Sequence, residues 1–222
     1  MSLEPSQTVA AFAVAHPHSV RVFERHHIDY CCGGQRSLAE ACAGAGVTPG
    51  ALLAEIEQAR PTRDDTDWST RPLTELVEHI VLRYHRTLEA ELPRLEKLAN
   101  KVAMVHGHLD PERFDALVHT FSALQADLLQ HMAKEEQVLF PWIRAGQGAG
   151  ADGPIHVMRL EHDEAGAMLA RLRELTGDYV VPEEACGSWR ALWTGLEGLE
   201  RELHEHIHLE NNVLFPRALD ED

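Results

Sequence analysis

Two stretches of the sequence pair a histidine with a glutamate four residues later, and both end in the letters VLFP. The first, HMAKEEQVLFP, contains His131 and Glu135, and the second, HIHLENNVLFP, contains His206 and Glu210. Residues four apart lie on the same face of a helix, so each stretch projects an imidazole and a carboxylate in one direction. Imidazole nitrogens and carboxylate oxygens together suit transition metals such as iron, manganese or zinc.

One further histidine precedes each of these pairs, on the apolar stripe of the preceding segment. It is His85 in the first half of the chain and His162 in the second. The chain is therefore interpreted as two similar helical hairpins, each contributing one histidine and one His-x-x-x-Glu pair.

These six side chains would be costly in a core that held no cations. An unpaired ionised glutamate in an apolar interior costs several kcal/mol, and two of them would repel each other. If each glutamate bridged two metal ions, each ion would have two imidazoles and two carboxylate oxygens, and an oxo or hydroxo bridge would add a fifth ligand. Such a site leaves room for a small molecule. The alternative is a set of mutually satisfied core polar groups. It would be preferred for one buried histidine, but not for a duplicated set of six.

The same stripe distinguishes the three histidines of LHEHIHLENN. His206 and Glu210 continue the apolar row that contains Leu203. Residues two apart on a helix point in nearly opposite directions. His206 is therefore predicted to face the interior, and His204 and His208 to face solvent.

Other residues with ligand chemistry stand outside the repeated pattern. His106 lies beyond the apolar stripe of the first predicted helix. It is predicted at most to contact a ligand, and not to be one. Glu89 follows His85 by four residues, but the corresponding position after His162 is Gly166, so a surface position is predicted for Glu89. The remaining histidines are assigned to surfaces or loops: His79, His119 and His156.

Long helices must position these side chains, and apolar residues recur with helical spacing in four segments. Helices are predicted over residues 73–105 and 111–144, from about residue 154, and from about residue 182, with glycine- or proline-containing breaks between them. Nothing alternates with the period of a strand. The predicted fold is all-α, with an antiparallel four-helix bundle over residues 73–222.

A polar stretch with two prolines, RPTRDDTDWSTRP, precedes the bundle, and residues 61–72 are interpreted as a linker. Residues 1–60 are assigned to a small helical domain. Within it, Thr48 and Pro49 predict the cap and the first turn of a helix that continues through GALLAEIEQA.

The composition narrows the range of partners and compartments. The chain has 222 residues and a formal net charge of -16. Such an acidic chain repels phosphate backbones and anionic lipids, so binding to nucleic acid or to membranes is not expected. The N-terminus lacks the pattern of a secretory signal, no apolar run is long enough to span a bilayer, and four cysteines are too few for a disulfide framework. These features predict a protein of the reducing cytoplasm.

Cys31 and Cys32 are adjacent, and the following Gly33-Gly34 predicts a helix end. A disulfide between neighbouring cysteines is strained. The pair is interpreted either as a functional site, for redox chemistry, transient iron binding or nitrosation, or as two small residues in a tight turn. The other two cysteines are isolated and are assigned structural roles: Cys42 and Cys186.

Five stretches carry a resemblance to a known family: DYCCGG, RYH, HMAKEEQVLFP, EHDEAG and HLENNVLFPRAL. Together they resemble the iron–sulfur cluster repair di-iron proteins, the repair-of-iron-centres family of the YtfE/ScdA type, over nearly the whole chain. The resemblance implies a short N-terminal ScdA-type domain and a C-terminal hemerythrin-like bundle with a non-haem, oxo-bridged centre of two iron ions. The ligands that it implies, with both glutamates bridging, are the six residues already selected: His85, His131, Glu135, His162, His206 and Glu210.

The resemblance also implies a function. Members of this family are cytoplasmic bacterial proteins that help to restore iron–sulfur clusters damaged by nitric oxide or oxidants. The expected partners are proteins with damaged clusters and two small gases, nitric oxide and dioxygen, and a homodimer is left open. The resemblance favours Cys31 and Cys32 as a redox or iron-transfer pair. Reduction of nitric oxide at the di-iron centre is a further, enzymatic hypothesis.

One position departs from the oxygen-carrying hemerythrins, which have a fifth histidine one turn after the third-helix ligand. This chain has Gly166 there. The departure argues against simple reversible oxygen carriage and for a labile centre that can give up iron. The alternatives are a hemerythrin-like oxygen or redox sensor or store, and a zinc-stabilised interaction protein.

Overall fold

Helices make up nearly all of the structure, a computed structural model that describes residues 7–59 and 66–220. Within these residues the only β pairing is an isolated bridge between Thr8 and Ser37. The predicted all-α class is therefore confirmed. Residues 61–65 of the predicted linker lie outside the described residues, and the division of the chain at residues 60 and 72 stays a prediction.

Residues 7–59, called the N-terminal unit below, contain four short helices: α1 (Val9–Ala15), α2 (Val20–Arg25), α3 (Leu38–Gly44) and α4 (Pro49–Gln58). Helix α4 begins as predicted, because Pro49 lies in its first turn and the Thr48 side chain accepts the N–H of Ala51 at 3.2 Å. These helices surround a small apolar core that includes Phe23 and Ile56. The N-terminal unit thus has its own hydrophobic core, which supports the loop between α2 and α3.

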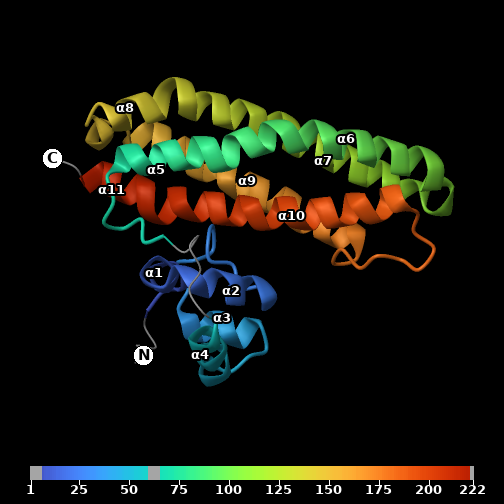
Figure 1. Ribbon diagram of the computed structural model, residues 1–222, viewed down its shortest axis with the longest axis horizontal. Helices are drawn as coiled ribbons and strands as arrows, with labels where there is room; N and C mark the ends of the chain where they lie inside the picture. The colour runs from blue at the N-terminus through green and yellow to red at the C-terminus, as the bar shows by residue number, and fades with distance from the viewer. Residues whose placement is uncertain (1–6, 60–65, 221–222) are drawn as a thin grey trace.

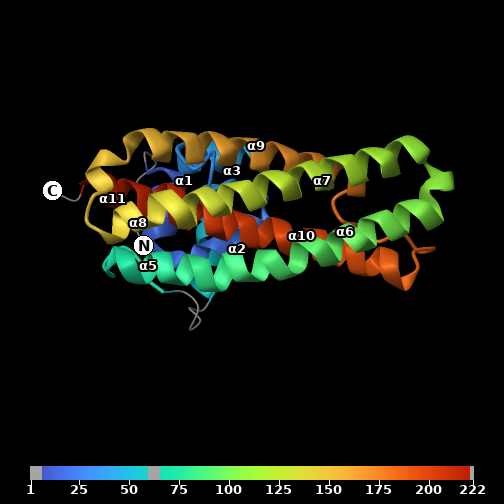
Figure 2. The same cartoon turned by 90° about the horizontal axis from the view of Figure 1, so that it is seen from above.

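Residues 73–220 form the predicted antiparallel four-helix bundle (Figures 1 and 2). Its helices are α5 (Leu73–Ile80) continued by α6 (Arg86–His106), α7 (Pro111–Lys134) continued by α8 (Phe140–Arg144), α9 (Asp152–Thr176), and α10 (Gly187–Leu209) continued by α11 (Phe215–Asp220). None of the helices in the described ranges has both the length and the apolar character that crossing a membrane requires.

The predicted start of the fourth helix, near Pro182, was wrong. Helix α10 begins at Gly187, with Cys186 as its N-cap. The preceding segment is held in an irregular conformation because the Arg190 guanidinium donates to the carbonyl oxygens of Glu183 and Ala185, both at 3.0 Å. The prediction rested on apolar spacing, which does not show such local hydrogen bonds from a side chain to the backbone.

Three of the four bundle helices contain a π-helical turn: Val81–His85, Glu135–Leu139 and Glu210–Leu214. In the last two the turn leads into the Phe-Pro of the VLFP motif. Proline lacks an N–H and its ring clashes with the carbonyl four residues earlier, so the widened turn accommodates Pro141 and Pro216 without ending the helix. The VLFP motif therefore marks a local widening immediately after each glutamate.

Two hydrophobic clusters fill the bundle, and a layer of polar residues separates them. One cluster lies towards the α6–α7 connection and includes Leu88 and Leu203; the other lies towards α8 and α11 and includes Ile80 and Val213. The residues buried between the clusters are His85, His131, Glu135, His162, His206 and Glu210. A polar layer inside an apolar bundle requires compensation.

Two glycines of α10 provide a test of the bundle packing. A Cβ on Gly195 would lie 2.5 Å from Leu95 Cδ2, whereas a Cβ on Gly198 would meet nothing within 4 Å. We expect Gly195→Ala to destabilise the protein by about 1–3 kcal/mol because Leu95 is fully buried. Gly198→Ala should stabilise it by about 0.5–1 kcal/mol through helix propensity. Chemical denaturation of both variants measures the difference, and equal effects would contradict the close approach of α10 to α6.

Candidate metal centre

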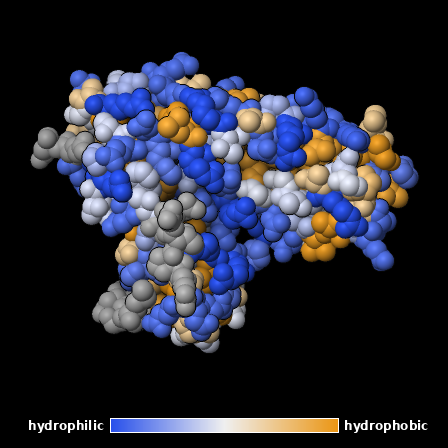
Figure 3. Space-filling view, in the orientation of Figure 1, coloured by the Kyte–Doolittle hydropathy of each residue, from blue (hydrophilic) through white to orange (hydrophobic). Residues whose placement is uncertain are grey.

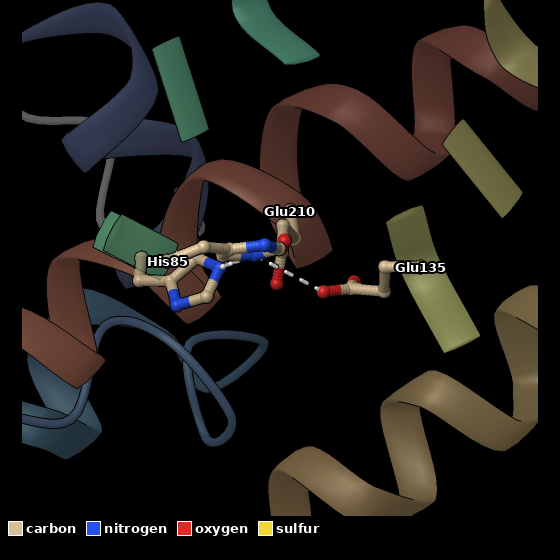
Figure 4. A group of neighbouring side chains, drawn as sticks. His85, Glu135 and Glu210 are labelled. Carbon is tan, nitrogen blue, oxygen red and sulfur yellow. Dashed lines mark hydrogen bonds and ion pairs between the residues drawn. The ribbon is translucent and has the colours of Figure 1, made fainter. Parts of the chain in front are cut away.

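The six polar residues of the buried layer form two groups that share both glutamates. The first His/Glu group comprises His85, Glu135, His206 and Glu210, and the second comprises His131, Glu135, His162 and Glu210. Within each group the candidate ligand atoms all lie within 4.8 Å of one another. Figure 4 shows the His85 ring and the two carboxylates turned toward a common point.

In the first His/Glu group, two imidazoles and two carboxylates face each other at close range. His206 Nε2 lies 2.9 Å from Glu210 Oε1 and 3.3 Å from His85 Nε2. His85 Nε2 also lies 3.4 Å from Glu135 Oε2. The Nε2 atoms of both rings therefore point at the shared carboxylates.

The second His/Glu group repeats this arrangement with the other two histidines. His162 Nε2 lies 3.1 Å from His131 Nε2 and 3.1 Å from Glu210 Oε2. His131 Nε2 lies 3.5 Å from Glu135 Oε2. Glu210 thus offers one oxygen to each group, as a bridging carboxylate does.

Several polar atoms of this layer have no hydrogen-bond partner although they are fully buried. They are both oxygens of Glu135 and Nδ1 of His206. Burying a carboxylate without a hydrogen-bond partner costs free energy, and a nitrogen lone pair that faces an oxygen lone pair forms no hydrogen bond. Four imidazole nitrogens and two carboxylates around one point match the donor preferences of iron, manganese or zinc, so the residues present fit a pair of such ions.

Three of the histidines are oriented by partners on their other ring nitrogen. The Nδ1 of His85 lies 2.9 Å from Glu136 Oε1, and the Nδ1 of His131 lies 2.9 Å from Glu161 Oε2. The Nδ1 of His162 lies 3.0 Å from the side-chain oxygen of Asn211. A carboxylate or amide oxygen accepts a hydrogen bond from Nδ1–H, which keeps the proton on Nδ1 and leaves Nε2 as a lone-pair donor toward the centre.

The three orienting residues were not identified from the sequence, although a signal was present. Glu136, Glu161 and Asn211 are each the immediate neighbour of a residue in the buried layer. A neighbour lies about 100° further around the helix, so it can reach the histidine of the adjacent helix rather than the interior. Arg86 contacts Glu136 and Lys134 contacts Glu161, which balances the charge of both carboxylates at the surface.

Without a cation, the buried charges compensate each other through protons. Burial alone would lower the pKa of His162, but Glu210, together with Glu135, outweighs burial and raises it to about 9. Burial would raise the pKa of Glu210, but His206 and His162 hold it well below its usual range. The metal-free layer therefore contains at least one imidazolium–carboxylate pair at neutral pH.

The outward face of α10 is covered by the N-terminal unit, so the predicted exposure of His204 and His208 was wrong (Figure 1). His204 is half-buried, with Nδ1 3.1 Å from Glu24 Oε1. His208 is 5% exposed, and its Nδ1 lies 3.3 Å from the carbonyl oxygen of Tyr30. Burial lowers the pKa of His208 to about 4. Helical spacing separated both residues from the interior of the bundle but could not reveal a second unit packed outside it.

The two adjacent cysteines lie in the loop between α2 and α3, not at the helix end that Gly33-Gly34 predicted. One carboxylate shapes this loop, because Asp29 accepts the backbone N–H groups of Cys31, Cys32 and Gly33 at 3.0, 3.1 and 2.8 Å. Both sulfurs are free thiols 3.9 Å apart. The hydrogen bond from Cys31 is the main cause that lowers the pKa of Cys32.

This cysteine loop reaches the bundle beside the third helix. The Cys32 sulfur lies 3.6 Å from the backbone oxygen of His162. A Cβ on Gly166, one turn further along α9, would lie 3.8 Å from the same sulfur. A Cβ there would be in ordinary van der Waals contact with the sulfur, so position 166 lies directly beside the cysteine loop.

Two cavities adjoin these residues. One of about 110 Å³ borders the second His/Glu group and is lined by His131, His162 and His206 among others. The other, of about 400 Å³, lies between the N-terminal unit and α9–α10, and its lining includes Cys31 and Cys32. The first is large enough for a small molecule, and both thiols border the second.

The remaining sequence candidates lie away from the buried layer. Glu89 is paired with Arg86 on the surface. His106 contacts Cys186 at the far end of the bundle, so it has no supporting place beside the buried layer. His119 and His156 are exposed, and His79 packs beside Trp68.

Comparison with known proteins agrees with this geometry. Residues 76–218 match the hemerythrin HHE cation binding domain, and residues 5–60 match ScdA_N, a domain of unknown function. Proteins named iron-sulfur cluster repair protein YtfE from Yersinia pseudotuberculosis serotype IB (strain PB1/+) and Yersinia pestis (strain Pestoides F) are each 44% identical over 216 residues. That alignment covers 96% of this chain and 97% of each relative. The chain belongs to the YtfE family of hemerythrin HHE proteins.

Membership of the YtfE family fits the donor set described above. The hemerythrin HHE description names cation binding, and both His/Glu groups lie within the residues that it matches. The ScdA_N match includes Cys31 and Cys32. In this YtfE family member the two matched regions therefore meet where Cys32 contacts His162.

Proposed function

We propose that this protein holds two iron ions in the His/Glu layer and supplies iron for the repair of iron–sulfur clusters damaged by nitrosative or oxidative stress. The observation that carries the proposal is the pair of His/Glu groups that share two buried carboxylates. Its relatives are named for iron–sulfur cluster repair. The proposed ligands are the six residues of the layer, with the two glutamates bridging: His85, His131, Glu135, His162, His206 and Glu210.

Each group of residues has a defined part in this proposal. Glu136, Glu161 and Asn211 hold the protons on the outer ring nitrogens, so the inner nitrogens stay available for metal. Bound iron supplies the ions that a damaged cluster lacks. His206 has no partner on Nδ1 and no fifth histidine occurs at position 166, so the layer is less firmly held than a fully supported one. Such a centre is suited to release.

We further propose that Cys31 and Cys32 receive iron or electrons on the way to a partner protein. Thiolates bind iron well, and the hydrogen bond from Cys31 lowers the pKa of Cys32, whereas the same contact and burial raise the pKa of Cys31 well above its usual range. Cys32, the thiol that ionises more readily, lies against the backbone of His162, and both thiols border the larger cavity. The partners are proteins with damaged iron–sulfur clusters. Free thiols at all four cysteines fit action in the cytoplasm.

Repair can be measured directly with a purified enzyme whose [4Fe–4S] cluster has been damaged by peroxide. We expect iron-loaded protein, added anaerobically with a thiol reductant and a ferrous chelator, to restore the cluster signal and the activity of that enzyme. Iron-free protein and an equal amount of ferrous salt should restore little, because the chelator captures free iron. Recovery no better with the loaded protein than with the salt would contradict iron donation.

Cysteine variants separate the thiols from the metal layer in the same assay. Cys31→Ser and Cys32→Ser should keep their iron but lose most of the repair rate. Cys186→Ser is the matched control, because Cys186 lies at the other end of the bundle, and it should repair at the normal rate. Full repair by the Cys31/Cys32 double variant would remove the thiols from the proposal.

The small cavity favours a second activity, the reduction of nitric oxide. Its volume of about 110 Å³ and its lining by three of the proposed ligand histidines suit a diatomic gas. Ferrous protein mixed anaerobically with nitric oxide should show spectral change and release nitrous oxide. Absence of both would exclude this activity, and a stable, reversible adduct with dioxygen would instead favour an oxygen-sensing or storage protein of hemerythrin type.

A further inference from the structure

A cysteine and a histidine from different helices meet at the end of the bundle remote from the His/Glu layer. The Nε2 of His106, the last residue of α6, lies 3.2 Å from the sulfur of Cys186, the N-cap of α10. Helix α6 has 21 residues, which at 1.5 Å per residue places this pair about 30 Å from His85. The pair has no part in the proposed iron chemistry.

The surroundings hold both side chains in place. The His106 ring packs against Trp189 with 4.9 Å between ring centroids, and Trp189 itself is buried against Phe114 and Trp193. On the other side, Arg190 fixes the carbonyl just before Cys186 by donating to the oxygen of Ala185. The contact between sulfur and imidazole is therefore built into the packing of three helices, not a chance approach of two mobile side chains.

The sulfur is both accessible and activated. Cys186 is exposed, whereas Cys31 and Cys42 are buried and Cys32 is half-buried. The backbone N–H of Trp189 at the start of α10, followed by the His106 side chain, lowers the pKa of Cys186 to about 7. Reactive cysteines typically occur in such partially exposed settings beside a helix N-terminus and a histidine, while structural cysteines are buried.

We propose that Cys186 and His106 form a thiol-exchange site for small disulfides, such as oxidised glutathione. The Cys186 sulfur attacks one sulfur of the disulfide, so a protein–thiol disulfide bond forms while the original S–S bond breaks. His106 Nε2 accepts the proton of the Cys186 thiol, and the departing thiolate takes up a proton and leaves as a free thiol. Cys186 is thereby oxidised and the small disulfide is reduced to one thiol, with no further reactant required.

Through such a site, the fraction of the protein that carries a mixed disulfide at Cys186 would follow the ratio of disulfide to thiol in the cell. The exchange is reversible, because a free thiol in excess attacks the mixed disulfide and restores Cys186. The site is independent of the iron proposal, since none of its residues belongs to the His/Glu layer. Either idea can therefore fail without the other.

The test uses the full-length, metal-loaded protein and the neutral disulfide dithiodipyridine, whose released thione is followed by absorbance. We expect one thiol per chain to react in a fast phase whose rate rises with a midpoint near pH 7, and peptide mass spectrometry to locate it at Cys186. Oxidised glutathione should add one glutathionyl group at the same residue. Cys186→Ser should remove the fast phase.

Variants of the histidine distinguish its nitrogen from its packing. His106→Phe keeps a ring against Trp189 but offers no nitrogen, so the midpoint should rise by about one pH unit and the rate at pH 7 should fall about fivefold. His106→Gln, which lacks the ring, should give the same shift if packing is irrelevant to reactivity. His108→Phe is the matched control, because His108 is exposed nearby, and its profile should equal that of the wild type.

Three results would overturn the proposal: a wild-type midpoint above about pH 8.5, fast reaction at Cys31 or Cys32 instead of Cys186, or unchanged profiles in both His106 variants. Thermal unfolding of each variant shows that it is folded under the assay conditions. The repair assay is a separate readout, so loss of repair with normal Cys186 reactivity would count against iron donation alone.

Discussion

Replacing Glu210 by glutamine is expected to remove both metal ions from the bundle, not one. Its Oε1 lies 2.9 Å from His206 and its Oε2 lies 3.1 Å from His162, so one carboxylate serves both His/Glu groups. The amide nitrogen of glutamine cannot act as a ligand, and the lost charge leaves too little compensation for two dications. Metal analysis of purified protein should fall from two ions per chain to below about half an ion.

Glu205→Gln is the matched control for this variant. Glu205 lies on the same helix and is half-buried, but it belongs to neither His/Glu group. It should keep two ions per chain and the visible spectrum of the wild type. Retention of one ion by Glu210→Gln would show that Glu210 does not bridge, and equal loss in both variants would contradict the assignment of helix faces.

The convergence of the six residues could be expected from the sequence because it depends on helical spacing alone. A histidine and a glutamate four residues apart share a helix face, and the repeat of HxxxE with VLFP fixes the same depth in both hairpins. The apolar residues above and below then place this layer between two hydrophobic clusters. Their role as ligands remains a prediction that metal analysis must test.

What the sequence could not reveal depends on contacts between separate elements. His208 has the spacing of a solvent-facing residue, yet the Tyr30 carbonyl covers it, because the N-terminal unit packs on α10. The same packing brings Cys32 to His162, although 130 residues separate them in the chain. The spacing of apolar residues indicates which face of a helix packs against one core. It does not indicate that a second unit packs against another face of the same helix.

The position of Cys186 illustrates the same difference. From the sequence it was an isolated cysteine with a structural role. The structure shows that it is exposed, because α10 begins at Gly187 and leaves Cys186 at the N-cap, and that it faces a histidine 80 residues earlier. The start of a helix decides whether a residue lies within the helix or at its end. Helical spacing locates that start poorly, so the sequence could not show that Cys186 is the N-cap of α10.

Removing the metal ions is expected to make the stability of the protein depend more strongly on pH above pH 6.5 than that of the loaded protein does. In the metal-free layer, the pKa of His162 is raised to about 9 from an ordinary value of 6.5. A raised histidine pKa stabilises the folded state fully below the unfolded value, and this stabilisation is lost as pH rises through the folded value. Metal-free protein should therefore lose stability between about pH 6.5 and 9.

The expected loss is large for one residue. The rise of the His162 pKa from 6.5 to about 9 corresponds to about 3–4 kcal/mol at most. The raised pKa of His85 acts in the same direction. His208, whose pKa is lowered to about 4, acts with the opposite sign and only below about pH 6.5, in both loaded and metal-free protein. His204, outside the layer, also has a raised pKa, because Glu24 outweighs its burial, and it acts above pH 6.5 in both forms. The difference between metal-free and loaded protein above pH 6.5 therefore reports on the layer.

Urea unfolding at pH 6.0, 7.5 and 9.0 measures this dependence in chelator-treated and metal-loaded protein. The midpoint of the metal-free form should fall steadily with pH. That of the loaded form should fall less, because metal occupies the ring nitrogens of the layer and they cannot take up protons, which leaves His204 as a shared contribution. His162→Gln should flatten the dependence in metal-free protein, whereas His119→Gln, at an exposed position of α7, should leave it unchanged. A metal-free form whose stability is constant or rises from pH 6.5 to 9 would show that the buried carboxylates are balanced by something other than imidazolium, and the argument that cations replace those protons would fail with it.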